Sequence, residues 1–300
     1  MLKNLIKAKH YTHEEDQYLE LIKDIINEGV MINGRNGNAL TVYGSAMRFS
    51  LENNIIPLLT TKRVAWKTCL KELLWFIKGE TNNELLQQQN VHIWDDNASK
   101  DFLESRNLPY EENDLGPVYG HQWRHFNAPY DNCKSNYNNL GVDQLKNVIK
   151  LLKDPSTRHS RRILMSAWNP CQLDEMALPP CHVLVQFNVL DNYKLSCSLY
   201  QRSGDVGLGV PFNIASYSFL THIIANICDL EPYEFIYYLG NCHIYDDHIE
   251  SLKEQVNRGP YEFPSITIKE KIQNIDSIDL NSIEINNYNH HKTISMKMRK

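Results

Sequence analysis

The stretch from Met176 to Tyr217 constrains the fold most, because it joins a predicted hairpin to the start of a buried helix. Two apolar runs with strand character, His182–Leu190 and Tyr193–Tyr200, are separated by an Asp-Asn pair that is typical of a tight turn. A Gly-rich segment leads from them into a largely apolar run, Phe212–Asp229, which predicts a buried helix. We therefore expect a sheet that packs against buried helices.

Periodicity along the rest of the chain extends this α+β pattern. Residues 91–142 are rich in Asn, Asp, Gly and Pro, and we expect long ordered loops there. No repeat, low-complexity segment or linker divides the chain, so we expect an N-terminal arm over residues 1–11 and a single α+β domain with a mixed sheet over residues 12–300. Helices are expected from a capping box of Thr12 and Glu15 to Gly29, and at Val64–Gly79, Val142–Lys153 and Cys242–Arg258; strands are expected at residues 40–44, within Thr157–Pro170 and at Tyr233–Leu239.

The charge and the cysteine content narrow the class of protein. Lys plus Arg is 31 and Asp plus Glu is 36, and the net charge of -5 indicates no bulk attraction to nucleic acid, messenger RNA included, or to a membrane surface. The seven cysteines form no Cys-x-x-Cys pair, so the sequence favours a reducing compartment and predicts no metal site. No apolar run has the length of a signal peptide or a membrane span. We expect a cytoplasmic protein, and a nuclear location stays open.

Cys181 is the sharpest candidate for a nucleophile. Two prolines before it fix the local backbone, His182 follows it, and Arg202 lies one strand later, where a guanidinium would stabilise a thiolate. Two interpretations stay open: a small buried hydrophobic residue, as most cysteines are, or the nucleophile of a Cys–His hydrolase. In the second case His243 is the better base, because neighbouring residues on a strand point to opposite faces.

Glu72 is an unexpected carboxylate in a predicted buried helix. Its neighbours at helical spacing include Trp75 and Phe76, and desolvation by such groups raises a carboxyl pKa toward neutrality, as a general acid or base requires. The alternative is a glutamate that pairs with a basic group or lies at the solvated edge of the helix. Trp94 and Tyr119 are either core aromatics or a platform for a flat ligand.

Four arginines and one asparagine complete the candidate site. Arg35, Arg161, Arg162 and Arg202 would form a pocket for a phosphate dianion, because each guanidinium presents a planar fork of donors. Solvated side chains and surface ion pairs are the alternatives for the first three. Asn213 is expected to begin a helix near this pocket. Its amide matches the adjacent carbonyl and N–H of uracil, although it would also serve as a helix cap.

Seven runs resemble signatures of the thymidylate synthase family, in the family's order, over about residues 12–298. Together they are far more specific than any short motif. Residues 126–142 resemble the insertion of the eukaryotic-type, stand-alone members. The runs are PLLTTKRVAWK, ELLWFIKGETN, LGPVYGHQWRHF, RRILMSAWNP, ALPPCH, YQRSGDVGLGVPFNIASY and HIYDDHIE.

This resemblance implies reductive methylation of dUMP to dTMP. The co-substrate 5,10-methylenetetrahydrofolate would supply the one-carbon unit and the hydride, dihydrofolate would be the second product, and no metal would be needed. Addition of Cys181 to C6 of uracil would turn C5 into the nucleophile that attacks the methylene carbon. The resemblance also implies a homodimer formed through the sheet, with Arg161 and Arg162 donated across the interface.

Matching positions carry the family's site residues over to this chain. Glu72 would run proton transfers, Tyr119 would order the water that takes the C5 proton, and Asn213 would read the uracil edge. The implied catalytic set is Cys181, Glu72, Tyr119, Asn213 and Asp205, the last of which would also hydrogen-bond the pterin. The implied dUMP site adds Arg35, Arg161, Arg162, His182, Gln201, Arg202, Ser203, Gly204, His243, Ile244 and Tyr245. The implied folate site contains Ile93, Trp94, Asp205, Leu208, Gly209, Phe212, Met298 and Arg299.

Three segments depart from the family pattern. The Arg35 loop reads RNGNAL and is one residue shorter than usual, Asn241 stands where the family usually has Asp, and the chain ends in Met298-Arg299-Lys300 instead of small apolar residues. Closure of the loop over phosphate and of the tail over folate is therefore in question. The rival functions are a dUMP or dCMP hydroxymethylase of the same fold, a Cys–His hydrolase, and a nucleotide- or RNA-binding protein. Asn213 favours uracil over cytosine.

Overall fold

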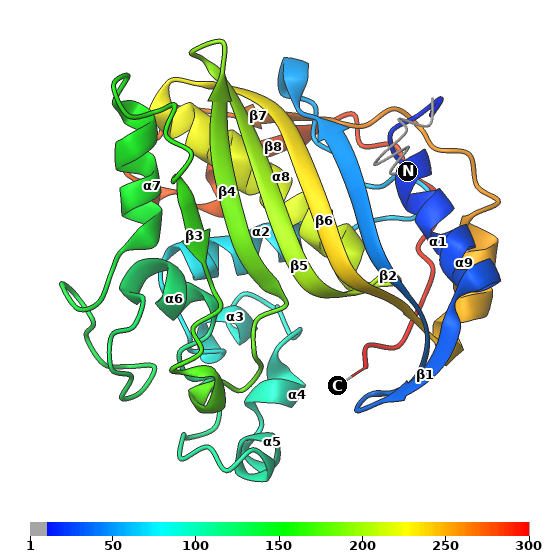
Figure 1. The fold of residues 1–300 in the computed structure, drawn as a ribbon, viewed down its shortest axis with the longest axis horizontal. Coiled ribbons are helices and arrows are strands. Elements are labelled where there is room, and N and C mark those ends of the chain that lie inside the picture. Colours follow the sequence, from blue (N-terminus) through cyan, green and yellow to red (C-terminus); the bar gives the residue numbers. More distant parts are fainter. Residues whose placement is uncertain (1–10, 300) are drawn as a thin grey trace, which may run out of the picture.

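The computed structural model describes residues 11–299, so the predicted arm over residues 1–11 lies almost wholly outside the described residues. A six-stranded sheet packs on one face against helix α8, which α2 covers in turn, and shorter helices and loops surround the edges of the sheet (Figure 1). The α-helices are α1 (Asp16–Glu28), α2 (Trp66–Ile77), α3 (Glu84–Gln87), α4 (Asp95–Ala98), α5 (Lys100–Ser105), α6 (Tyr119–His125), α7 (Gln144–Lys153), α8 (Gly209–Cys228) and α9 (Ile249–Gln255). The strands are β1 (Val30–Gly34), β2 (Gly37–Ser50), β3 (Leu164–Ser166), β4 (His182–Leu190), β5 (Lys194–Asp205), β6 (Glu231–Tyr245), β7 (Ser265–Ile268) and β8 (Ile283–Asn286).

The main sheet is mixed, as the sequence predicts. Its strand order is β1-β2-β6-β5-β4-β3, and β7 and β8 form a separate antiparallel pair. Only β5 and β6 run parallel within the main sheet, and α8 makes the crossover between them. The carboxyl ends of β5 and β6 therefore meet at one edge, where Ser203, Gly204 and Asp205 pair with Asn241, Cys242 and His243.

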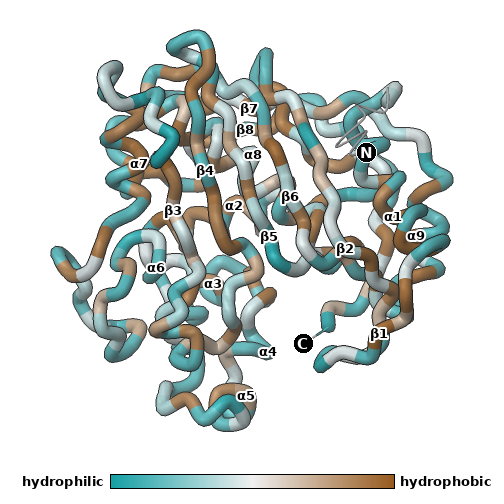
Figure 2. The backbone as a smooth tube through the Cα atoms, in the orientation of Figure 1, coloured by the Kyte–Doolittle hydropathy of each residue, from teal (hydrophilic) through white to brown (hydrophobic). Residues whose placement is uncertain are grey.

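Helix α8 is the centre of the core. All but three of its twenty residues are buried, because α2 covers one side of it and strands β5 and β6 cover the other. The two hydroxyls of Ser218 and Thr221 return to carbonyls one turn earlier, both at 2.7 Å, so they enter the core without unsatisfied donors. Hydrophobic residues recur along this helix and the strands in front of it (Figure 2). Within residues 11–299, none of the helices combines the length and hydrophobicity that a membrane span needs.

The predicted hairpin is confirmed. Strand β4 has the expected bounds, and Asp191 and Asn192 have φ values of 50° and 67°. Two successive left-handed residues make a type I′ turn, which the Tyr193 N–H closes by donating to the Leu190 carbonyl at 3.1 Å. The sequence thereby places the end of β4 correctly. Strand β5 begins one residue later than predicted, at Lys194, and continues to Asp205 instead of ending at Tyr200.

Several predicted boundaries are wrong. Residues 242–245 are the last part of β6 and not of a helix, because all four pair with β2 and the first two also pair with β5. Helix α9 begins only at Ile249, after a 3₁₀ turn over Asp246–His248. Helix α8 begins at Gly209, with Pro211 in its first turn, so Asn213 lies inside the helix. Residues 91–142, predicted as loops, contain α4, α5 and α6.

The predicted capping box at α1 is also wrong. The Thr12 hydroxyl donates to Asp16 Oδ2 at 2.9 Å, and the Glu15 side chain makes no capping bond. Glu15 is instead fully buried, and each of its carboxylate oxygens accepts from the backbone N–H and the hydroxyl of one residue, Thr60 or Thr61, at 2.6–2.8 Å. The Glu15 carboxylate therefore binds two threonines that are distant in sequence, and not the start of α1 as the local motif predicts.

Candidate active site

Cys181 directly precedes β4, and its backbone is held on both sides. The Tyr119 hydroxyl accepts the Cys181 N–H at 2.7 Å, and the Cys181 carbonyl accepts the Arg202 N–H at 3.0 Å. The Arg202 side chain donates from Nε to the Pro180 carbonyl and from Nη2 to the Pro179 carbonyl, both at 2.8 Å. Arg202 therefore fixes the Pro-Pro segment and also presents its positive charge beside the thiol.

Opposing effects act on the Cys181 thiol. Burial raises the pKa of the thiol, while the charges of Arg202 and Arg35 lower it, and burial has the larger effect. These are two of the four arginines that the sequence assigns to an anion pocket. Arg161 and Arg162 are exposed in the segment before β3, and within residues 11–299 neither makes a hydrogen bond or ion pair with the predicted site residues around Cys181. One chain alone therefore brings only half of the predicted arginines to the cysteine.

Glu72 lies in α2 beside an aromatic wall. Its Oε1 atom accepts the Trp94 Nε1–H at 2.8 Å. Burial raises the pKa of Glu72 to about 7, and the Trp94 hydrogen bond opposes that rise. The Tyr119 ring centroid lies 6.2 Å from that of Trp94 and 5.0 Å from that of His182, so the wall connects Glu72 with the cysteine segment. The predicted shift of the Glu72 pKa toward neutrality is confirmed.

His182 and Asn213 form an oriented pair. Burial lowers the pKa of His182 to about 3, and the Arg202 charge adds to the effect, so the imidazole is neutral. Asn213 Nδ2 lies 2.6 Å from His182 Nε2 and donates to it, which directs Asn213 Oδ1 toward the Tyr237 hydroxyl at 3.4 Å. The same hydroxyl donates to Gln201 Oε1 at 2.6 Å. A histidine of such low basicity is a poor base for a thiol, which weakens the hydrolase hypothesis.

The end of β6 supplies a second group of predicted residues. His243 Nδ1 lies 2.9 Å from Asn241 Oδ1, and burial lowers the pKa of His243. The His243 and Tyr245 ring centroids are 5.2 Å apart, and the Tyr245 hydroxyl accepts from Asn36 Nδ2 at 3.5 Å. The Ile244 side chain is fully buried, so only the main chain of that residue can face the site. In the described part of the chain the His243 side chain is bonded to Asn241 and no hydrogen bond joins it to Cys181, so it is not positioned as the base of a hydrolase.

The turn after β5 is held by two residues that sequence reasoning missed. Asp205 Oδ1 accepts two N–H groups of its own turn at 2.8 and 3.3 Å. The Tyr18 hydroxyl donates to the Val206 carbonyl at 2.9 Å, and the Lys62 ammonium donates to the Gly207 carbonyl. Burial lowers the pKa of Lys62 to about 8, against the opposing charge of Asp205. The available signal was the lysine that directly follows the uncharged run PLLTT.

The predicted folate residues lie around these groups, and their exposure differs. Trp94 is buried in the aromatic wall, and Arg299 binds two aspartates at the end of β6. Partly exposed side chains occur at Ile93, Leu208 and Phe212, Gly209 begins α8, and Met298 is exposed. Among residues 11–299 no group of three or more His, Cys, Asp or Glu side chains is arranged to hold a metal ion.

Comparison with known proteins identifies the family. A family model described as thymidylate synthase matches residues 16–300. The bifunctional dihydrofolate reductase-thymidylate synthase of Plasmodium chabaudi is 52% identical over 297 residues, which are 98% of this chain and 50% of that protein. Thymidylate synthase of Saccharomyces cerevisiae is 49% identical over 296 residues, and thymidylate synthase 1/2 of Encephalitozoon cuniculi is 48% identical over 289 residues; both matches cover 95% of this chain and 97% of the relative.

The chain thus spans about half the length of its bifunctional relatives and nearly the whole length of the other two. The arrangement around Cys181 and these matches together lead to one conclusion: the chain belongs to the thymidylate synthase family.

Proposed function

We propose that this chain converts dUMP to dTMP by reductive methylation, with 5,10-methylenetetrahydrofolate as the donor of carbon and hydride and dihydrofolate as the second product. The observation that supports this best is the arrangement around Cys181. A thiol lies beside Arg202, an acid with a pKa of about 7 lies across the aromatic wall, and Asn213 presents an oriented amide. These groups match the three needs of the reaction: a nucleophile, a proton carrier and a reader of the pyrimidine edge.

In this mechanism Cys181 acts first. Its sulfur bonds C6 of the base, and the electrons of the C5–C6 double bond move toward C5 and O4, where Glu72 supports the developing charge through water. C5 then bonds the methylene carbon as the bond from that carbon to the first folate nitrogen opens. A water ordered by Tyr119 removes the C5 proton, and the bond from the same carbon to the second folate nitrogen breaks, so that tetrahydrofolate leaves an exocyclic methylene at C5 and can return a hydride to it. After hydride reaches the exocyclic carbon, the S–C6 bond breaks and Cys181 leaves as the thiolate. Arg202 favours the thiolate at the beginning and the end of the cycle.

The proposed nucleotide site uses both groups of residues. Arg35, Arg202 and Ser203 hold the phosphate, and His243 with Tyr245 binds the deoxyribose hydroxyl. Asn213 binds the edge of the uracil, and the neutral His182 supports this role. The imidazole accepts one Nδ2 proton of the Asn213 amide, so the second Nδ2 proton and a lone pair of Oδ1 are left for the base. Asp205 and the start of α8 are assigned to the folate.

We further propose that the enzyme is a homodimer that forms through the sheet. The face opposite α8 carries one row of side chains across four strands, in which Leu184 pairs with Tyr200, Tyr200 with Tyr238, and Tyr238 with Ala46. The first three are large, apolar and exposed, which is typical of an interface. A partner seated there would bring its own Arg161 and Arg162 to the phosphate.

The proposed location is the cytoplasm, and one feature of the chain supports it. All seven cysteines are free thiols, as a reducing compartment favours.

A reaction with purified protein, dUMP and methylenetetrahydrofolate tests the function. We expect dTMP and dihydrofolate in equal amounts, and no dTMP from Cys181→Ala, which should still bind dUMP. A hydroxymethylated nucleotide together with tetrahydrofolate would identify the hydroxymethylase instead. If Cys181→Ala turned over as fast as the unaltered chain, the result would contradict the covalent mechanism.

A further inference from the structure

The end of the chain is tied to a pair of adjacent aspartates by one arginine. Arg299 Nη2 lies 2.8 Å from Asp246 Oδ1 and 2.9 Å from Asp247 Oδ1, and its Nε donates to Asp247 Oδ1 at 3.2 Å. Both aspartates follow β6 directly, in the turn between Tyr245 and α9. A planar guanidinium can satisfy two neighbouring carboxylates that would otherwise repel each other. This contact uses a residue at which the chain departs from the usual apolar tail of the family.

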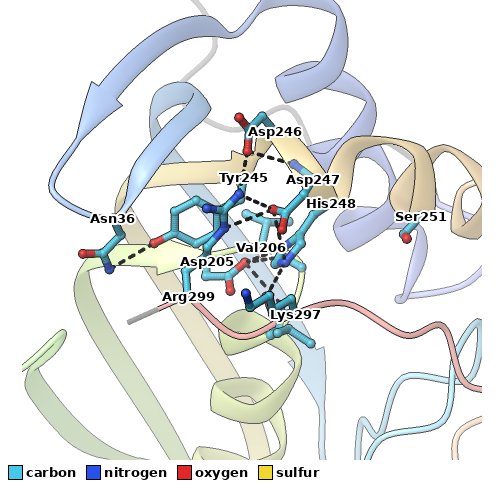
Figure 3. Close-up of polar contacts among 12 residues, drawn as sticks. Asn36, Asp205, Val206, Tyr245, Asp246, Asp247, His248, Ser251, Lys297 and Arg299 are labelled. Atoms are coloured by element: carbon cyan, nitrogen blue, oxygen red, sulfur yellow. Dashed lines mark hydrogen bonds and ion pairs between the residues drawn. The ribbon is translucent and has the colours of Figure 1, made fainter. Parts of the chain in front are cut away.

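The same guanidinium also reaches the proposed nucleotide site. Arg299 Cζ lies 5.7 Å from the centroid of the Tyr245 ring, and Figure 3 shows the guanidinium between that ring and the two aspartates. The Tyr245 hydroxyl is bonded to Asn36, next to Arg35. Arg299 Nη1 also approaches the turn of residues 34–37, at 3.3 Å from where a Cβ on Gly37 would lie. Arg299 therefore lies against Tyr245, which is assigned to the deoxyribose, and against the turn that carries Arg35, which is assigned to the phosphate.

Hydrogen bonds from side chains to backbone carbonyls hold the preceding residues of the tail along the same surface. His248 Nε2 lies 2.7 Å from the Lys297 carbonyl, and the Ser251 hydroxyl donates to the Ser295 carbonyl at 3.5 Å. These bonds set the course of the tail past the end of β6 (Figure 3). These hydrogen bonds along residues 295–297 therefore position the Arg299 side chain.

We propose that Arg299 is a positioning residue that couples the C-terminal segment to the nucleotide site, by holding the Tyr245 ring and the turn of residues 34–37 in place through its ion pairs with Asp246 and Asp247. The proposal rests on the function given above and deepens it. Arg299 was expected to line the folate pocket; its contacts assign it to the nucleotide side. Because the ion pairs are partly exposed, their contribution to global stability is small, and their effect belongs to the local geometry of the site.

The experiment compares Arg299→Gln with Lys297→Gln, which removes the same charge two residues away while its carbonyl bond to His248 remains possible. Calorimetry measures dUMP affinity without turnover, and steady-state kinetics gives KM and kcat. We expect Arg299→Gln to weaken dUMP binding and raise its KM about fivefold with kcat changed less than about twofold, as loss of uniform binding predicts. Hydrogen exchange should speed up at residues 34–37 and 294–299. Lys297→Gln should match the unaltered chain in all three measurements.

A second pair of variants tests the ion pair itself. Asp246→Asn should also weaken dUMP binding. Adding Arg299→Gln to Asp246→Asn should reduce the dUMP affinity by less than Arg299→Gln does in the unaltered chain, because one partner of the ion pair is already lost. Arg299→Lys should restore part of the affinity. Fully additive effects, or an Arg299→Gln protein equal to Lys297→Gln, would overturn the coupling.

The outcome also separates this inference from the proposed reaction. If the unaltered chain binds dUMP, makes no dTMP and still shows the Arg299 effect, the reaction fails and the coupling stands. If it makes dTMP and Arg299→Gln binds dUMP normally, the coupling fails alone. A chain that binds no dUMP overturns both.

Discussion

Glu72 is a carboxylic acid whose protonation is tied to folding. Its pKa is about 7 in the folded chain against an ordinary value of 4.5. Between these values the unfolded chain has lost the proton that the folded chain keeps, so stability falls as pH rises from 4.5 to 7. Glu72→Gln removes this penalty. We expect the variant to gain at most on the order of 3 kcal/mol over the unaltered chain above neutral pH, and nothing below about pH 4. Urea unfolding at both extremes measures it; a gain that does not vary with pH would contradict the assignment.

Asn213 is the residue at which nucleotide preference is set in the proposed site. Its amide is oriented by His182 and Tyr237, so a change at this side chain acts on the base edge directly. We expect Asn213→Asp to lower kcat/KM for dUMP and raise it for dCMP, because a carboxyl group complements the amino group and N3 of cytosine. The ratio of the two kcat/KM values is the measurement. An unchanged ratio would remove Asn213 from base recognition.

Some candidate site residues were predictable because their own chemistry is unusual in the local sequence. A cysteine after two prolines and a glutamate in an apolar helix are visible in this way, as Cys181 and Glu72 were. Tyr18 and Lys62 were not, because each acts on a backbone carbonyl of the turn after β5 and lies far from it in sequence. Such contacts depend on tertiary packing, for which one sequence holds no periodic signal.

At the scale of elements, α1 is anchored by a buried carboxylate at its first turn. Glu15 accepts four hydrogen bonds from Thr60 and Thr61, which joins α1 to the segment before α2. We expect Glu15→Ala to lower the free energy of unfolding by about 3 kcal/mol, because it leaves two buried N–H groups without acceptors. Glu28→Ala, at the exposed end of the same helix, should change it by less than about 0.5 kcal/mol. Chemical denaturation of both variants checks this; equal effects would count against the anchor.

The elements were predicted best where local and long-range forces agree. The β4–β5 hairpin needs only its turn residues and its apolar runs, and it was predicted to the residue at the end of β4. The end of β6 was predicted as helix because residues 242–258 have a helical pattern. The first four residues of that segment pair with β2, and the first two also pair with β5. These backbone hydrogen bonds outweigh the local helical preference.

At the scale of the whole molecule, the proposed homodimer would explain both the uncovered face of the sheet and the two distant arginines. Arg161 and Arg162 directly precede β3, the strand at one edge of the sheet. The exposed row of Leu184, Tyr200 and Tyr238 crosses the neighbouring strands of the same sheet. A second copy related by a twofold axis would cover this row, and the same operation would exchange the arginines between the two sites. Burial of the row and completion of the phosphate pocket would then be one event.

Mixed dimers provide the test of this exchange. Arg161→Ala should weaken dUMP binding by about tenfold, and Cys181→Ala should be inactive. If Arg161 acts across the interface, a dimer of the two variants has one site with both defects and one site with neither. Equal mixing with free exchange should then recover about a quarter of the unaltered activity at low dUMP, because half of the dimers are mixed and each holds one intact site. Arginines that acted within their own chain would leave both sites of the mixed dimer defective, so the absence of recovery, in dimers shown by mass to be mixed, would reject the exchange.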